Sequence, residues 1–406
     1  MIPENWDIVE LGSLIDYIKG FAFKSDDYQS DGVRIIRVSD TTFDSIKGVN
    51  QIYIAHDKAY LYSKWMLKEY DLILSTVGSK PPMYDSMVGK VIIIEKQYDG
   101  ALLNQNAVLI RAKRRKPYKQ ILLLNHLRTK RYLRYIELIF RGNANQASIT
   151  LNDLFHFQLA LPHNDVEQQA IATALSDVDA LITSLDKLIA KKRDIKQATM
   201  QQLFTGKTRL PEFSKEWEVK KLGDIGETIT GSTPPTSVKE FWNGDIPWVT
   251  PTDINNQKYI YSTEREITSI GLNATRELPQ NSVLVTCIAS IGKNAILKRR
   301  GSSNQQINAI IPSNNYDADF IYYLMEISKD YLLSKAGITA TNIISKKVLL
   351  EIRFSFPTKA EQQAIATVLS DMDAEIVALE QRRDKTRALK QGMMQELLTG
   401  KTRLLS

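Results

Sequence analysis

The chain has 406 residues, of which 43% are hydrophobic and 24% are charged, the balance of a soluble globular protein with more than one core. The single cysteine, Cys287, excludes a disulfide framework, and the four histidines lack the spacing of metal ligands. No apolar run approaches the roughly 18 residues of a membrane span. The first residues do not resemble a signal peptide, so we expect a cytoplasmic protein.

The first part of the chain contains short β-rich runs separated by turn residues. VRIIRV, DLILSTV, KVIIIE, NAVLIRA and FQLALP are each expected to form a strand. One helical stretch, at about residues 118–140, precedes the last of them. Strands mixed with a helix in this way indicate an α+β domain, which we place at residues 1–161.

Positive charge is clustered within this first domain. The formal net charge of the chain is +7, and the run RAKRRKPYK contains basic residues with no acid among them. A cluster of this kind favours a polyanionic partner. We expect Arg114, Arg115 and Lys116 to contact phosphate groups, and the alternative interpretation is a charge run that meets only solvent.

A long helix is predicted next, within residues 162–211. Apolar residues recur there in alternating steps of four and three, the heptad pattern of a helix that packs along another helix. They are Ile171, Leu175, Val178, Ile182, Leu185 and Ile189. Asn164 and Glu167 form a loose capping box before this pattern, and Gly206 stands where a helix would end. About 40 residues at 1.5 Å each give a helix of roughly 60 Å.

The rest of the chain follows the same plan. Residues 212–356 have the pattern of a second α+β domain, and residues 357–406 that of a second long helix. Its heptad residues are Ile365, Leu369, Met372, Ile376 and Leu379. Thr358 and Glu361 form the capping box of this second helix, and Gly400 corresponds to the terminating glycine of the first.

The repetition can be aligned directly. A shift of 194 residues aligns residues 167–210 with residues 361–404 without a gap, and 27 of these 44 positions are identical. The two α+β domains resemble each other more faintly. Within them, TVGSKPP is set against IASIGKN, which pairs Ser79 and Lys80 with Ser290 and Lys293. The chain is therefore two copies of one plan, domain then helix.

Signs of catalysis are weak. TGKTRL, present in both copies, ends like a phosphate-binding loop, but the glycine required five residues before Gly-Lys is Gln201 in one copy and Gln395 in the other. Both copies also follow a helix, where backbone amides do not point at a phosphate. Cys287 is best interpreted as a buried small hydrophobic residue. We therefore expect no catalytic residue and no metal site in this chain.

The architecture resembles a known family. Two divergent α+β domains, each followed by a copy of one helical segment, are similar to the DNA specificity subunit of type I restriction–modification systems. The segments EQQAIATALSDVDALI and LFTGKTRLPEFSKEWEVKKLG, with their second copies, carry the resemblance. It covers the whole chain.

The resemblance implies a function and a set of partners. Each α+β domain would be a target recognition domain that reads one half of a split, asymmetric sequence in double-stranded DNA. Two antiparallel, coiled-coil-like helices would separate the domains and set the gap. The chain would seat two methyltransferase subunits and direct restriction subunits. S-adenosylmethionine would belong to the methyltransferase, and ATP and Mg to the restriction subunit, with no cofactor in this chain.

On this resemblance, loop residues with amide, hydroxyl or basic side chains are the candidates for DNA contact. In the first domain they are Lys24, Ser25, Ser79, Lys80, Arg141, Asn143, Asn145, Gln146 and Ser148. In the second domain they are Ser232, Thr233, Thr236, Ser290, Lys293, Thr339, Thr341 and Asn342. Each could instead belong to an ordinary solvated loop or turn. Helix residues expected to face outward, toward the methyltransferase, are Gln168, Gln169, Lys191, Arg193, Lys196 and Gln197.

Two other functions stay open at this point. A two-module adaptor that binds protein or glycan would share the helices but show no salt-sensitive DNA binding. An enzyme, either a nucleotide hydrolase or a methyltransferase, would require affinity of the isolated chain for ATP or for the methyl donor.

Overall fold

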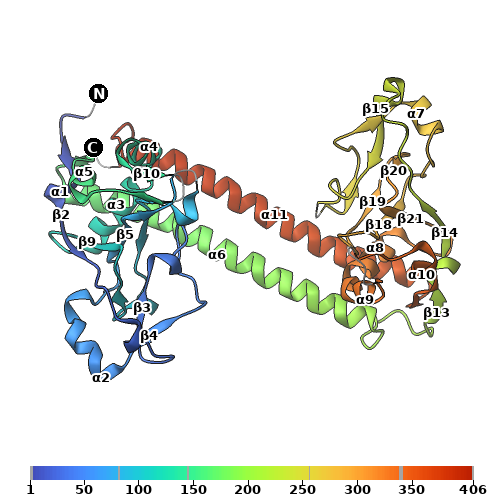
Figure 1. Ribbon diagram of the computed structural model, residues 1–406, viewed down its shortest axis with the longest axis horizontal. Coiled ribbons are helices and arrows are strands. Elements are labelled where there is room, and N and C mark those ends of the chain that lie inside the picture. The colour runs from blue at the N-terminus through green and yellow to red at the C-terminus, as the bar shows by residue number, and fades with distance from the viewer. Residues whose placement is uncertain (1–2, 81–82, 144–145, 256, 338–341, 405–406) are drawn as a thin grey trace. The chain divides into compact units, whose positions relative to one another are not determined.

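The computed structural model describes residues 3–80, 83–143, 146–255, 257–337 and 342–404. Contacts divide the chain into two compact units. Unit 1 is Met1–Asp186 with Gln381–Ser406, and unit 2 is Lys187–Glu380. Each unit holds one of the predicted α+β domains and a part of both predicted long helices (Figure 1).

Unit 1 is built on an antiparallel sheet of four strands in the order β2-β9-β5-β7. Two small sheets, β4-β3-β8 and β10-β11-β6, and the pair β1-β12 complete its β-structure. The strands are β1 (Trp6–Glu10), β2 (Ile15–Lys19), β3 (Val33–Ile36), β4 (Ile52–Ile54), β5 (Leu72–Ser75), β6 (Val77–Gly78), β7 (Val91–Ile93), β8 (Leu102–Leu103), β9 (Ala107–Ala112), β10 (Arg141–Asn143), β11 (Gln146–Ser148) and β12 (Gln158–Pro162). The predicted β-rich runs VRIIRV, DLILSTV, KVIIIE, NAVLIRA and FQLALP all contain one of these strands.

Helices cover this sheet. The prediction of one helix over residues 118–140 is wrong, because the segment forms α3 (Pro117–His126) and α4 (Lys130–Ile139). The Thr129 side chain accepts the N–H of Tyr132 at 3.2 Å and so caps the start of α4. Tyr132 is fully buried and packs in the core with residues of α3 and the sheet. The short helices of the unit are α1 (Leu11–Leu14), α2 (His56–Ala59) and α5 (Leu151–Phe155).

Unit 2 repeats the arrangement with a sheet of five strands in the order β14-β21-β18-β19-β16. A three-stranded sheet, β17-β15-β20, and the pair β13-β22 accompany it. The strands are β13 (Glu218–Lys221), β14 (Gly226–Thr230), β15 (Trp242–Val249), β16 (Tyr259–Ile260), β17 (Glu266–Ile267), β18 (Ser282–Thr286), β19 (Asn294–Leu297), β20 (Ser302–Ser303), β21 (Ile307–Pro312) and β22 (Arg353–Phe356). Its short helices are α7 (Ser269–Asn273), α8 (Ala318–Ile327), α9 (Lys329–Ser334) and α10 (Lys346–Glu351).

The two long helices form as predicted. They are α6 (Asp165–Phe204), with 40 residues, and α11 (Lys359–Leu397), with 39 residues. Most of their heptad residues are buried, among them Leu175, Leu185 and Ile189 of α6 and Leu369 of α11. The others are half-buried, namely Val178, Ile182, Met372 and Leu379. The core of unit 1 contains residues from the start of α6 and the end of α11, and the core of unit 2 contains the end of α6 and the start of α11, as expected for antiparallel packing. No helix in the described ranges is both long and apolar enough to span a membrane.

The ends of these helices confirm one prediction and correct another. Gly206 and Gly400 follow the two helices with φ of +66° and +73°, the left-handed conformation of a helix-terminating glycine. The side chain of Asn164 accepts the N–H of Val166 at 2.8 Å, so it does cap α6. The prediction for the second residue of each capping box is wrong, however. The carboxylates of Glu167 and Glu361 bind arginine side chains instead of the helix start.

Candidate nucleic-acid interface

A buried glutamate near the start of each long helix binds an arginine of the other repeat. In unit 2, Arg209 of the first TGKTRL segment donates two hydrogen bonds to Glu361 of α11, at 2.6 and 2.7 Å. The indole N–H of Trp217 reaches the same carboxylate at 3.4 Å, and the guanidinium lies 5.7 Å from the indole ring. Glu361 is only 1% exposed. This two-pronged geometry is that of a strong arginine–carboxylate contact.

Unit 1 contains the matching cluster. Arg403 of the second TGKTRL segment donates to both oxygens of Glu167 in α6, at 2.5 and 2.7 Å. Its guanidinium lies 5.9 Å from the ring of Trp6. The two Glu–Arg–Trp clusters explain why TGKTRL and EQQ are repeated so faithfully, because the exit of each repeat binds the helix start of the other. The TGKTRL segment therefore links the two repeats, and it does not have the geometry of a phosphate-binding loop.

Charged pairs continue along the long helices with the same symmetry. In unit 1, Lys390 meets Asp179 at 2.7 Å and Arg387 meets Asp186 at 3.0 Å. The pairs that correspond to them after a shift of 194 residues lie in unit 2. They are Lys196 with Asp373, at 2.5 Å, and Arg193 with Glu380, at 2.5 Å. Partly exposed pairs of this kind add little stability. Ion pairs between two helices can nevertheless favour one register over others.

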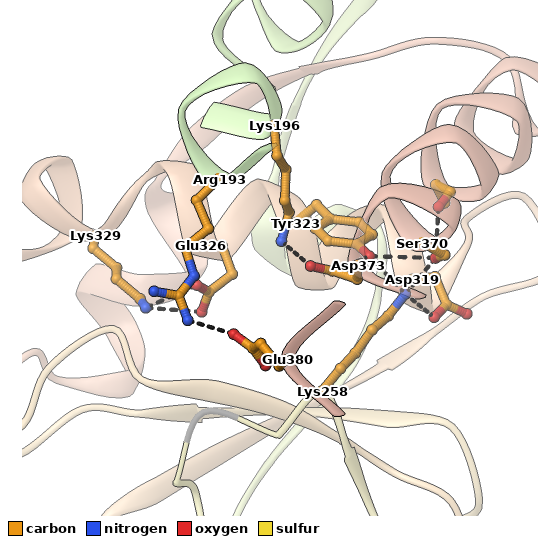
Figure 2. Close-up of polar contacts among 11 residues, drawn as sticks. Arg193, Lys196, Lys258, Asp319, Tyr323, Glu326, Lys329, Ser370, Asp373 and Glu380 are labelled. Carbon is orange, nitrogen blue, oxygen red and sulfur yellow. Dashed lines mark hydrogen bonds and ion pairs between the residues drawn. The ribbon is translucent and has the colours of Figure 1, made fainter. Parts of the chain in front are cut away.

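In unit 2 the α+β domain is joined to α11 by a polar network, shown in Figure 2. The Lys258 ammonium lies 2.7 Å from Asp319 and donates to Ser370 of α11 at 2.8 Å. The Tyr323 hydroxyl donates to Asp373 at 2.6 Å. Burial lowers the pKa of Lys258, and the nearby Asp319 carboxylate works against this shift. The network lines a cavity of about 650 Å³.

The candidate DNA-contacting residues of the first domain are brought together in part. Antiparallel pairing places β11 between β10 and β6, with Ser148 opposite Val77. The small sheet therefore carries Arg141, Asn143, Gln146 and Ser148, all exposed, beside the segment that continues into Ser79 and Lys80. Asn145 lies outside the described residues.

The individual side chains of this group differ in availability. Ser79 is buried and accepts a hydrogen bond from Ser86 at 2.9 Å, whereas Lys80 is exposed. Arg141 lies 2.8 Å from Asp153 while remaining 67% exposed. Lys24 and Ser25 are exposed on a separate loop.

The basic run lies on a third loop of unit 1, directly after β9. Arg114, Arg115 and Lys116 are all exposed, and Arg114 lies 3.8 Å from Asp165 at the start of α6. Lys119 of the same run is closer to that carboxylate, at 2.8 Å. One acid therefore partly neutralises the run, which contained no acid within its own sequence.

The second domain brings its candidates together in the same way. The N–H of Ala289 donates to the carbonyl of Asn342 at 3.1 Å, so the loop of Ser290 and Lys293 lies against the segment of Asn342. Thr339 and Thr341 lie outside the described residues. Lys293 and Asn342 are exposed and Ser290 is half-buried.

The remaining candidates of this domain, Ser232, Thr233 and Thr236, follow β14. Ser232 is occupied by backbone contacts, since its hydroxyl accepts the N–H of Arg276 at 3.1 Å. Thr233 donates to Gln305 at 2.7 Å while remaining exposed, and Thr236 is exposed.

The alignment of Lys80 with Lys293 is wrong. The N–H of Ser75, at the end of β5, donates to the carbonyl of Lys90, and the N–H of Thr286, at the end of β18, donates to the carbonyl of Lys293. Lys293 therefore corresponds to Lys90, and the first domain has the longer loop. Lys90 is 2% exposed, and burial lowers its pKa to about 8.

The helix residues expected to face outward do not all do so. Gln169, Lys191 and Gln197 are exposed. Gln168 is only 9% exposed and donates to the carbonyl of Pro162 at 2.7 Å, so its placement on an outward face is wrong. The partly exposed Arg193 and Lys196 already bind α11, as described above.

The remaining predictions concern the single cysteine and the possible metal ligands. Cys287 is buried, as predicted, and burial raises the pKa of its thiol. Within the described ranges, no group of three or more His, Cys, Asp and Glu side chains is arranged to hold a metal ion.

Comparison with known proteins assigns the family. The model of the type I restriction modification DNA specificity domain matches the chain twice, at residues 3–195 and 214–387. The chain belongs to the type I DNA specificity subunit family. The putative type I restriction enzyme MjaX specificity subunit of Methanocaldococcus jannaschii is 28% identical over 420 residues, 99% of this chain and 95% of that subunit.

Other specificity subunits match over shorter stretches. The MjaIX specificity subunit of the same organism is 40% identical over 172 residues, 41% of this chain and 40% of its own length. The EcoR124I/EcoR124II specificity subunit of Escherichia coli is 33% identical over 172 residues, 40% of this chain and 42% of its own length. The chain thus matches less than half the length of these two relatives.

Solved structures confirm the fold class. The S subunit of a type I restriction–modification system from M. genitalium has a TM-score of 0.62 at 15% identity, with 97% of this chain and 96% of that chain covered. A chain from a study of complex assembly and conformational transition of the type I R-M system has a TM-score of 0.59 at 16% identity, with 99% and 100% covered. The predicted α+β specificity-subunit fold with an internal repeat is therefore confirmed, and the specificity subunit has the expected two matched domains.

Proposed function

We propose that this specificity subunit recognises a bipartite, asymmetric DNA sequence, with one half read by each α+β domain. The observation that supports this most directly is the crosswise pair of Glu–Arg–Trp clusters. Each cluster attaches one domain to the ends of both long helices, so two different domains are attached to the helices by the same contacts. Two different domains held in equivalent ways suit a DNA target made of two different halves.

In the first domain, the small sheet β10-β11-β6 is the base-reading element. Arg141, Asn143 and Gln146 are exposed on it and carry the amide and guanidinium groups that recognise base edges. Arg114, Arg115 and Lys116 contact phosphates and supply affinity that is independent of sequence.

In the second domain, the paired loops of Ser290, Lys293 and Asn342 have the same role. Thr233 and Thr236 are further hydroxyl groups at this domain's surface. Thr236 can donate a hydrogen bond, whereas Thr233, which donates to Gln305, can accept one. The basic run of the first domain has a weaker counterpart here, because Arg299 and Arg300 each face an acid, Asp245 and Glu277, at 3.9 Å. The first half of the target is therefore held with the stronger electrostatic attraction.

The long helices set the length of DNA between the two halves and bind the partners. α6 and α11 are each continuous, and their ion pairs hold one register. Gln169, Lys191 and Gln197 are exposed and contact methyltransferase subunits. Methyl transfer from S-adenosylmethionine takes place in those subunits, and ATP- and Mg-dependent cleavage in a restriction subunit, so this chain carries out recognition alone.

Domain exchange tests the proposal. The first domain, residues 1–161, is replaced by that of another specificity subunit, and methylated adenines are mapped in cells that carry the hybrid system. One half of the methylated sequence should change while the other half and the gap stay the same. A change in both halves, or in neither, would exclude one-domain, one-half recognition.

Salt-dependent binding tests the phosphate contacts. Each phosphate contact contributes about 0.9 to the slope of log affinity against log salt. Replacing Arg114, Arg115 and Lys116 by alanine should lower the slope by up to roughly 3 and weaken binding to all sequences alike. The matched control replaces Lys298, Arg299 and Arg300, and should lower the slope less. If wild-type protein with its methyltransferase shows no salt-sensitive DNA binding, the adaptor function becomes the better explanation.

A further inference from the structure

Unit 1 has an apolar cavity with a positively charged rim. Its volume is about 300 Å³ and it lies between α1, the end of β9, α3 and the start of α6. The apolar lining includes Leu14, Leu122, Leu123 and Leu161. The polar lining consists of Ser13, Lys113, Arg114, Lys119 and Gln168. A cavity of this size admits one large side chain.

The corresponding place in unit 2 is filled by the chain itself. Strand pairing makes Phe356 the counterpart of Leu161, because Glu218 and Asp7 are their partners in β13 and β1. The ring of Tyr316 packs edge-on against Phe356, with centroids 5.2 Å apart. The ring of Phe320 also packs against Phe356, with centroids 6.0 Å apart, so aromatic side chains cover in unit 2 the counterpart of a residue that lines the cavity in unit 1.

The two units differ in the length of the loop beside this position. In unit 2, residues 313–317 join β21 to α8, whereas in unit 1 only residues 113–116 join β9 to α3. The strands end at equivalent positions, since Ile110 and Ile310 pair with the equivalent Leu72 and Val283. The shorter loop lacks a counterpart of Tyr316 and carries basic residues in place of it.

The equivalent glutamines of the two units, Gln168 and Gln362, differ in their hydrogen bonds. Gln362 donates to the carbonyl of Pro357 at 2.9 Å and accepts the backbone N–H of Asp317 at 3.0 Å. Gln168, its counterpart, also donates to a proline carbonyl, that of Pro162. Among the described residues, the side-chain oxygen of Gln168 has no donor, although the residue is nine-tenths buried and lines the cavity. An acceptor in this position favours a ligand that brings an N–H group.

We propose that the cavity of unit 1 binds a segment of a partner protein that presents an aromatic side chain followed by a carboxylate. The aromatic ring fills the apolar lining as Tyr316 does in unit 2. A backbone N–H of the segment donates to Gln168 as that of Asp317 donates to Gln362. The carboxylate meets Lys113 and Arg114 at the rim. The inference rests on the proposed function only in expecting that partner subunits bind this chain.

The lining favours protein over nucleic acid. Four leucines line the apolar part of the cavity, and a phosphate group would lose its hydration against them without gaining a matched set of donors. Asp165 partly neutralises Arg114 and Lys119, so the positive charge left at the rim suits one carboxylate better than the repeated charges of a DNA backbone. This interpretation gives part of the basic run a protein ligand, so contact with DNA becomes an outcome of the test.

The chain supplies its own probe. A capped, fluorescently labelled peptide with the sequence of residues 313–319, SNNYDAD, is titrated into the full-length protein and its anisotropy is followed. Saturable binding is expected, and the same peptide with alanine in place of tyrosine should bind at least about tenfold more weakly, because the buried aromatic ring is lost. Equal binding of the two peptides would overturn the proposal.

Variants of the protein locate the binding. Ser13 is exposed at the cavity, so Ser13→Trp covers the opening without altering the core, and Ser13→Ala is the matched control. Ser13→Trp should abolish peptide binding and Ser13→Ala should keep it, with circular dichroism checking that both fold. Lys113→Glu, also at an exposed position, should weaken binding, most strongly at low salt. Binding that survives both Ser13→Trp and Lys113→Glu lies elsewhere and contradicts the proposal.

DNA binding is measured on the same proteins with the methyltransferase present. Intact peptide binding with no DNA binding by the wild type would reject the proposed function and retain the cavity inference. Normal DNA binding without peptide binding would reject the cavity inference and retain the proposed function. If the peptide does not bind and Ser13→Trp lowers DNA affinity, the cavity belongs to the DNA-contacting surface and the inference is wrong.

Discussion

The two junctions between a recognition domain and the long helices have the same helix residues but differ in what the domain supplies. On the helix side, each junction has one lysine–aspartate pair, Lys390 with Asp179 in unit 1 and Lys196 with Asp373 in unit 2. These four residues are related by the shift of 194 positions. Each domain therefore meets an identical pair of charges on its helices.

The domains meet these charges with residues from unrelated positions. Unit 2 uses Lys258, in the loop before β16, together with the Tyr323 hydroxyl. Unit 1 uses Arg128, just after α3, which donates to the carbonyl of Val91 at 3.2 Å. Burial lowers the pKa of Arg128, while the charge of Asp179 raises it. A repeated helix thus imposes one electrostatic requirement, and each domain satisfies it independently.

The strongest test of this comparison is to break the part that the two units share. Glu361→Ala removes a buried carboxylate and leaves Arg209 without its partner, so it should lower the free energy of unfolding of unit 2 by about 2–3 kcal/mol. Glu167→Ala should lower that of unit 1 by a similar amount. Hydrogen exchange of backbone amides, read separately for each unit, provides the measurement.

Arg209→Ala and the double variant complete the cycle in unit 2. A coupling energy near zero would mean that the Glu–Arg–Trp cluster does not hold the repeats together. A large loss of stability in only one unit would show that the two equivalent clusters do not stabilise their units equally.

The second test removes a contact that is specific to unit 2, the Lys258 network. Lys258→Met keeps the apolar stem and deletes the charge that Asp319 and Ser370 bind, and we expect unit 2 to lose about 2 kcal/mol. Unit 1 should be unaffected. Lys298→Met, at a lysine partly exposed in the same unit, is the control and should change stability by less than about 0.5 kcal/mol. A loss from Lys258→Met no larger than that of the control would contradict the role of the network.

The same contrast explains what sequence patterns could predict. The helices were predicted well because a heptad seam, a terminating glycine and a near-identical repeat all point the same way. TGKTRL was correctly excluded as a phosphate loop, but its Arg209 was not recognised as the partner of Glu361, since helix-start glutamates usually act as caps. Pairing between residues 152 positions apart leaves no local pattern.

The domain surfaces were harder to predict for the same reason. The hairpin that groups Arg141, Asn143 and Gln146 depends on β11 pairing with β6, a contact between distant segments. Lys258 and Arg128 occupy unmatched positions in divergent domains, so comparing the repeats did not reveal their similar task. Lys80 was aligned with Lys293 by local similarity, whereas strand register assigns Lys90. Local patterns predict elements, and tertiary pairing decides which loops meet.

The corrected register leads to a pH-dependent difference between the units. Lys90 is buried with a pKa lowered to about 8, while its counterpart Lys293 is exposed. The unfolded chain has the ordinary lysine pKa of 10.5, so it binds more protons between pH 8 and 10.5 and unit 1 should gain stability as pH rises. Allowing for partial solvation, we expect about 1 kcal/mol across this window.

Lys90→Met should remove this rise, and Lys293→Met should leave it in place. Hydrogen exchange at matched chemical exchange rates, between pH 8 and 10.5, distinguishes the two. A rise that persists in Lys90→Met would assign it to another group.

The smallest effect is expected where the two units are most alike. Arg193 with Glu380 and Arg387 with Asp186 are equivalent pairs on the long helices, and the side chain of Arg193 is 61% and that of Arg387 50% exposed. Solvent screens such pairs, so Arg193→Ala or Arg387→Ala should each cost only about 0.3–0.5 kcal/mol, falling further at high salt. We expect these pairs to disfavour other registers of the two helices, an effect that a stability measurement does not detect.

Charge reversal separates these roles. Arg193→Glu alone places like charges together across the helices, and adding Glu380→Arg restores an opposite pair. If the pair selects register, the single variant should broaden the gap length accepted between the methylated half-sites and the double variant should restore it. If both variants methylate the same sites with the same gap as the wild type, the apolar heptad seam alone sets the register and the repeated charges are not needed for it.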